Sequence, residues 1–101
     1  MKPPENMEAI VGRKRYSTRT ATLLAGNDFW DGCNWERNNR NMFLYRTKNG
    51  RYFRVMLTRW KGEKDSLTPM NEEDAMELFE ALEEKRVTQE EAFPGVTIEE
   101  A

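Results

Sequence analysis

The sequence predicts a small α+β domain, in which an antiparallel sheet of three to four strands packs against one main helix. The length of 101 residues is enough for one hydrophobic core. Two strand-like runs flank Asn49-Gly50 within residues 42–60, and apolar residues recur at helical spacing within residues 71–86. We therefore expect the 42–60 hairpin at the centre of the sheet and the 71–86 helix on one of its faces.

The ends of the chain are expected to lie outside the packed core. Residues 1–8 contain two prolines and few apolar side chains, which is typical of a flexible N-terminal segment. A single domain is expected over residues 9–98, and residues 99–101 are expected to be frayed.

The first strands are short, and a long polar segment follows them. Residues 10–18 predict a strand entered through a glycine turn, and the threonines of residues 20–25 favour a second strand. Residues 26–41 are rich in Asn, Asp and Gly, which indicates turns. This segment also carries Trp30 and Trp35, so it is either pinned to the core or presents a contact surface.

The hairpin over residues 42–60 has the clearest turn signal. Asn-Gly between strand-like runs is typical of a type I′ turn, because both central residues of that turn need a positive φ. A two-residue turn at this position pairs Lys48 with Arg51 and Leu44 with Val55.

Side-chain alternation then divides the hairpin into two faces. An aliphatic face is expected to pack against the helix; it carries Met42, Leu44, Phe53, Val55 and Leu57. The opposite face mixes aromatic side chains with arginine and threonine; it carries Phe43, Tyr45, Thr47, Tyr52, Arg54, Met56, Thr58 and Trp60. The second face is more apolar than an ordinary solvent-facing surface and more polar than a deep core.

The helix over residues 71–86 has recognisable ends. Asn71 is predicted to be the N-cap, and acidic residues follow it in the first turn, where the helix dipole favours them. Lys85 and Arg86 are expected in the last turn for the same reason. An apolar stripe connects the two ends: Ala75, Leu78, Phe79 and Leu82.

The segments on either side of this helix are expected to be less regular. Residues 61–68 are polar and are predicted to be a connection. Thr88 and Glu91 repeat the spacing of a capping box, which predicts a short helical turn ended by Pro94-Gly95. Residues 96–98 are either a short strand or a docked tail.

Composition excludes several function classes. The sequence has no histidine and one cysteine, Cys33, so His-based catalysis and a Cys/His zinc site are excluded within one chain. No apolar run approaches the roughly 18–20 residues of a membrane span. The chain starts without a hydrophobic signal segment, and we expect a cytoplasmic protein. We predict no catalytic residue, no cofactor and no metal site, and therefore no enzyme.

Charge is divided unevenly along the chain. Residues 1–61 carry 13 of the 16 Lys+Arg residues, whereas residues 62–101 carry 13 of the 18 Asp+Glu residues. Such a division indicates either a charged partner or one half of the chain neutralising the other.

Three blocks of the sequence, residues 14–21, 44–53 and 69–75, carry a family resemblance. They are similar to the KRY-T-TA start, the LYRTK-G-YF hairpin and the PLTEEEA-type helix start of a family of small bacterial proteins. That family is common in Firmicutes and often found on mobile elements. Ser17 and Arg19 depart from the Asp and Glu that the family usually has. The family has no established activity, so the resemblance implies an architecture and a bacterial or mobile-element source.

Two surfaces are candidates for binding. An aromatic and basic surface would comprise Trp30, Trp35, Tyr45, Tyr52, Arg54 and Trp60. An acidic helix face would comprise Glu73, Glu77, Glu80 and Glu84. We predict a non-enzymatic protein-interaction module, monomeric or homodimeric. One alternative is a nucleic-acid-binding module that uses the basic aromatic face. The other is an acidic inhibitor that imitates nucleic acid and blocks a host defence protein.

Overall fold

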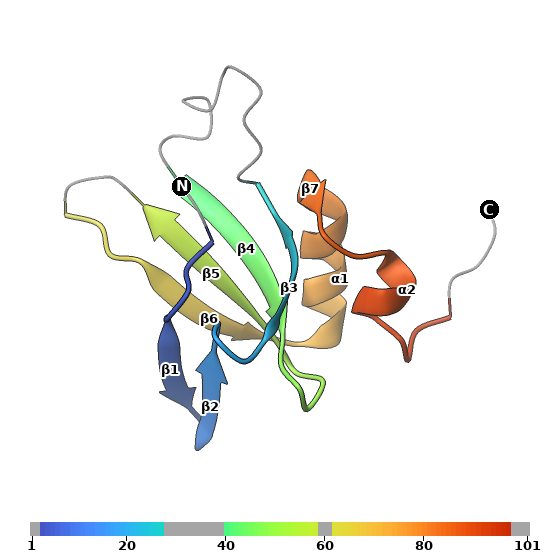
Figure 1. The fold of residues 1–101 in the computed structure, drawn as a ribbon, viewed down its shortest axis with the longest axis horizontal. Coiled ribbons are helices and arrows are strands. Elements are labelled where there is room, and N and C mark those ends of the chain that lie inside the picture. Colours follow the sequence, from blue (N-terminus) through green and yellow to red (C-terminus); the bar gives the residue numbers. More distant parts are fainter. Residues whose placement is uncertain (1–2, 28–39, 59–61, 98–101) are drawn as a thin grey trace.

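The computed structural model describes residues 3–27, 40–58 and 62–97 and has an α+β fold (Figure 1). Within the described residues, a five-stranded antiparallel sheet takes the place of the three to four strands predicted, beside a separate two-stranded sheet. The strands are β1 (Glu8–Val11), β2 (Lys14–Ser17), β3 (Thr22–Gly26), β4 (Arg40–Arg46), β5 (Tyr52–Thr58), β6 (Ser66–Met70) and β7 (Glu84–Lys85). The helices are α1 (Glu72–Ala81) and α2 (Gln89–Ala92).

The main sheet has the strand order β6-β5-β4-β3-β7, and its two outermost strands were not predicted. The polar segment 61–68 was predicted to be a connection, but residues 66–68 belong to β6, which pairs with β5 over its whole length. Pairing with β5 gives the backbone N–H and C=O groups of β6 their hydrogen-bond partners. The polar composition of the segment does not indicate this pairing.

The predicted helix 71–86 is shorter in the structure, because α1 ends at Ala81. Leu82 is already extended and is 4 % exposed, so it enters the core from outside the helix. Lys85 lies in β7, opposite Ala25 of β3, and the Arg86 amide donates to the Leu24 carbonyl at 2.9 Å. Lys85 and Arg86, which the charge pattern assigned to the last helical turn, therefore pair with the edge of β3.

The central hairpin is present, but its register differs from the prediction by one residue. Tyr45 lies opposite Phe53, so Leu44 does not pair with Val55. The type I′ turn is also wrong, because Asn49 does not adopt a positive φ whereas Gly50 has a φ of 82°. The Thr47 amide donates to the Arg51 carbonyl at 2.7 Å, which closes a three-residue loop. Such loops combine a type I turn with a left-handed residue, a position that suits glycine.

This one-residue shift reassigns the side chains to the two faces of the sheet, because strand side chains alternate. Leu44 packs with the helices as predicted, but Phe53 and Val55 lie on the opposite face. The helix-side core contains Leu24, Ala25, Leu44, Tyr52, Ala75, Phe79, Leu82, Ala92 and Phe93. The hairpin-side core contains Tyr16, Phe43, Tyr45, Phe53 and Val55, with Leu57 packed against it. The expected packing of Phe53, Val55 and Leu57 on the helix is therefore wrong.

The short helix α2 closes the helix-side core. Thr88 caps it, and the reciprocal capping box with Glu91 is confirmed. Phe93 follows the helix and stacks on Tyr52 with ring centroids 5.0 Å apart. The Tyr52 hydroxyl donates to the Ala92 carbonyl at 2.9 Å. Burial raises the pKa of this phenol above its usual value of 10.0, so it stays protonated and keeps donating.

The N-terminal strands form a hairpin that projects on the side away from the helices (Figure 1). Residues 10–18, predicted to be one strand, are divided between β1 and β2 by a two-residue turn. Gly12 has a φ of 58° and Arg13 a φ of 66°, which is the type I′ pattern expected at Asn49-Gly50. Tyr16 of β2 packs edge-on against Phe53, with centroids 5.7 Å apart, and so fixes the hairpin to the main sheet.

Replacing Arg13 by glycine is expected to raise the free energy of unfolding by about 0.5–1 kcal/mol. An L-residue in the left-handed region costs roughly 1–2 kcal/mol, and the larger entropy loss of glycine offsets roughly half of that gain. Urea denaturation followed by circular dichroism measures the change. Arg19→Gly, at an exposed turn position without a positive φ, is the matched control. An equal or lower stability of Arg13→Gly relative to the parent protein contradicts the prediction.

Candidate functional site

The aromatic and basic side chains proposed from the sequence do not share one surface. Tyr45 is 3 % exposed in the hairpin-side core, whereas Tyr52 is 4 % exposed in the helix-side core. Arg54 is half-buried on the same side of the sheet as Tyr52. Trp30, Trp35 and Trp60 lie outside the described residues. That candidate surface contains five aromatic residues. The two that the structure describes, Tyr45 and Tyr52, are buried.

The acidic residues proposed from the sequence are placed on two elements. Glu73, Glu77 and Glu80 are exposed on α1, and their spacing places them on one side of that helix. Glu84 lies in β7 and is half-buried, because the chain leaves the helix before reaching it. Three of the four carboxylates can therefore act as one helix face.

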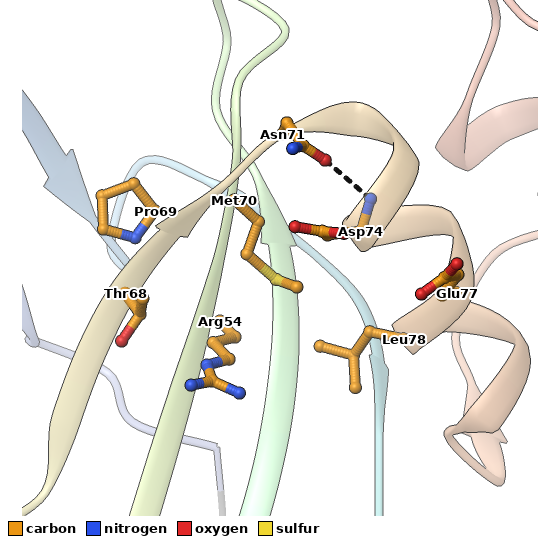
Figure 2. A pocket seen from close by; sticks show the side chains of 8 residues that line it. All are labelled: Arg54, Thr68, Pro69, Met70, Asn71, Asp74, Glu77 and Leu78. Atoms are coloured by element: carbon orange, nitrogen blue, oxygen red, sulfur yellow. Dashed lines mark hydrogen bonds between the residues drawn. The ribbon is translucent and has the colours of Figure 1, made fainter.

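Arg54 and Glu77 both line a groove between α1 and β6, which we call the α1–β6 groove (Figure 2). Its volume is about 610 Å³. It is lined by Arg54, Thr68, Pro69, Met70, Asn71, Asp74, Glu77 and Leu78. Figure 2 shows the β5 and β6 side chains along one wall and the α1 side chains along the other.

Local sequence explains how each wall is built. Arg54 lies opposite Thr68 in the pairing of β5 with β6, so both side chains are on the helix side of the sheet. Asn71 precedes α1, and its side-chain oxygen accepts from the Asp74 amide at 2.7 Å, which confirms the predicted N-cap. This cap fixes the first turn, and the helical repeat then places Leu78 beside Asp74 along the same wall.

The groove offers charges of both signs around apolar side chains. Arg54 provides a guanidinium, and Asp74 and Glu77 provide two carboxylates. Among the described residues, Arg54 forms no ion pair with either carboxylate, so the sheet and helix do not neutralise each other here. Met70 and Leu78 are half-buried and provide apolar contact area. Such a combination can bind a short segment that is itself apolar and charged.

A second groove, which sequence reasoning missed, lies between the turns of the two hairpins. We call it the hairpin groove; it is lined by Arg13, Lys14, Arg15, Thr47, Asn49 and Arg51 and has a volume of about 490 Å³. The sequence feature that indicates this groove is the presence of lysine and arginine residues beside both turns. Only the tertiary structure places the β1–β2 turn next to residues 47–51.

Comparisons with known proteins add no family to this picture. No family model, no curated protein and no solved structure matches the chain. In the described part of the chain, no group of three or more metal-ligating side chains is placed to hold a metal ion. No helix in that part is long and apolar enough to cross a membrane.

Proposed function

We propose that this protein is a non-enzymatic module that binds a short segment of another protein in the α1–β6 groove. The observation that carries the proposal is the lining of the groove, in which a cation, two carboxylates and apolar side chains face one open space. Protein segments present the same three kinds of group, whereas a purely apolar or purely anionic ligand would leave part of the lining unmatched.

The lining suggests the chemistry of the bound segment. Asp74 and Glu77 favour a lysine or arginine side chain, and Arg54 favours a carboxylate. An apolar side chain between these charges would contact Met70 and Leu78. Burial of that anchor supplies most of the affinity, while the charged contacts select the sequence and its direction.

The edge of β6 supports recognition through side chains. β6 is an outermost strand, and an outermost strand can bind a partner strand through its free backbone groups. Pro69 lies within β6 and lacks a backbone N–H, so it removes one donor from a strand of five residues. The groove beside β6 is therefore favoured over strand addition to its edge.

Selection from a random peptide library tests this proposal on the purified protein. We expect enriched peptides that combine a basic, an apolar and an acidic residue. Charge reversal in the groove, by Arg54→Glu or Glu77→Lys, is expected to weaken their binding by about 10-fold or more, which corresponds to about 1.4 kcal/mol.

Glu90→Lys is the matched control, because Glu90 is exposed on α2 and does not line the groove. It introduces the same charge change as Glu77→Lys and is expected to leave peptide binding unchanged. The proposal fails if selection yields no peptide above background. It also fails if Glu90→Lys weakens binding as much as Glu77→Lys does.

A further inference from the structure

We infer that the hairpin groove binds the phosphate backbone of duplex nucleic acid. This site is separate from the α1–β6 groove and does not depend on the function proposed for it. It also differs from the surface that the sequence suggested for nucleic acid, because Tyr45 and Tyr52 of that surface are buried.

The charge of the hairpin groove is uniform in sign. Among the described residues, its lining contains four cations, Arg13, Lys14, Arg15 and Arg51, and no carboxylate. Arg15 is paired with Glu8 at 2.8 Å, but within the described residues no ion pair involves the other three cations. Cations gathered without counter-charges create a positive potential that attracts anions, whatever the net charge of the whole chain.

The positions of these cations are set by well-defined turns. The Thr47 hydroxyl accepts from the Arg51 amide at 3.0 Å, which fixes the backbone of Arg51 at the end of its loop. On the other wall, β1 and β2 pair residue for residue, from Glu8 with Ser17 to Val11 with Lys14. The contact of Tyr16 with Phe53 holds the two hairpins against one core. The groove therefore exists before a ligand arrives.

Arg13 occupies a backbone conformation in which glycine is favoured. Its φ of 66° places it in the left-handed region, and its side chain lines the groove. A cationic side chain at this position costs stability that glycine would recover. Residues kept in costly conformations are concentrated at functional sites, so this observation supports a binding role for Arg13.

The lining also favours a phosphate backbone over other anionic ligands. Apart from the cations, the lining residues that the structure describes are Thr47 and Asn49, and neither is apolar or aromatic. Among these described lining residues, an acidic protein segment would find no apolar anchor and a single strand would find no ring on which to stack bases. Arg, Lys and Asn donors are the groups that contact phosphate oxygens in duplexes. A two-stranded ribbon such as β1–β2 also fits the width of a major groove.

A neighbouring pocket limits where the duplex can bind. Arg51 also lines a space shared with Glu72 at the start of α1. The carboxylate of Glu72 repels phosphate, so the duplex is expected to contact the β1–β2 side of Arg51. This placement leaves the acidic helix away from the bound backbone.

Fluorescence anisotropy with a labelled DNA duplex of about 20 base pairs tests the inference at several salt concentrations. The logarithm of the binding constant is expected to fall linearly with the logarithm of salt, with a slope of about −2 to −4 for a few phosphate contacts. The double variant Arg13→Ala/Arg51→Ala is expected to reduce the magnitude of this slope by about 2 and to weaken binding at least about 10-fold at low salt.

The matched control is Arg19→Ala/Lys64→Ala, which removes two exposed cations outside the groove. It is expected to leave the slope unchanged. The single variant Arg13→Gly separates binding from folding, because it is expected to bind more weakly while unfolding at higher urea. Urea denaturation of each variant verifies that it is folded.

Three outcomes would overturn the inference. One is the absence of duplex binding by the parent protein at low salt. Another is an equal loss of binding in the two double variants, which would indicate a diffuse electrostatic effect. The third is tighter binding of a single strand of the same sequence, which would indicate a stacking surface elsewhere. None of these results bears on the peptide selection that tests the α1–β6 groove.

Discussion

Replacing Phe53 by alanine is expected to lower the free energy of unfolding by about 3–5 kcal/mol. The Phe53 side chain is fully buried at 0 % exposure in the hairpin-side core. It stacks on Tyr45 with centroids 5.1 Å apart and meets the ring of Tyr16 edge-on. Removing the ring therefore leaves a cavity and also releases the contact that holds the β1–β2 hairpin to the sheet. Urea denaturation followed by circular dichroism measures the loss.

The same substitution tests the register of the central hairpin. With the register predicted from the sequence, Phe53 would pack on α1 and share contacts with Phe79. In the structure Phe53 and Phe79 belong to different cores. The effects of Phe53→Ala and Phe79→Leu should therefore add within about 0.3–0.5 kcal/mol in a double-mutant cycle. A coupling above about 1 kcal/mol would contradict the observed packing. Phe53→Leu retains part of the volume and keeps the test usable if the alanine variant unfolds.

Replacing Phe93 by alanine is expected to lower the free energy of unfolding by a similar amount, about 3–5 kcal/mol. Phe93 is 1 % exposed and contacts two rings of the helix-side core. It stacks on Tyr52 at 5.0 Å and meets Phe79 edge-on at 5.6 Å. Its loss would also release α2, whose last residue, Ala92, accepts the hydrogen bond from Tyr52.

The matched control for Phe93 is Val96→Ala, a smaller truncation nearby. Val96 is half-buried and packs at the edge of the same core, so a loss of roughly 1 kcal/mol or less is expected there. Phe93 and Phe79 share an edge-on contact, so their substitutions should be coupled by about 0.5–3 kcal/mol. A small effect of Phe93→Ala, comparable with that of Val96→Ala, would show that the segment after α1 is not part of the core.

The features that the sequence predicts correctly depend on neighbours in the chain. The start of α1 follows from Asn71 and the acidic residues after it, since a cap and the helix dipole act over one turn. The capping box of Thr88 and Glu91 is local for the same reason. The presence of a hairpin around Asn49-Gly50 likewise follows from turn residues between two strand-like runs.

The sites depend on contacts between distant parts of the chain. Arg54 and Glu77 were both candidates, but on different surfaces, and the pairing of β5 with β6 brings them to one groove. Arg13 and Arg51 lie far apart in the basic half of the chain. They line one groove because Tyr16 attaches the β1–β2 hairpin beside residues 47–51. No local pattern encodes that attachment.

The sequence by itself determines the α+β class, the central hairpin, the start of α1 and the cap of α2, because turn and capping preferences act within a few residues. The tertiary structure decides the hairpin register, the fate of residues 82–86 and the position of both grooves. Both faces of the central hairpin are covered by other elements. The alternation of side chains therefore does not distinguish a buried face from an exposed face, and it does not determine the register. Asn49-Gly50 is compatible with two turn types, and burial of Phe53 and Leu44 on opposite faces selects between them.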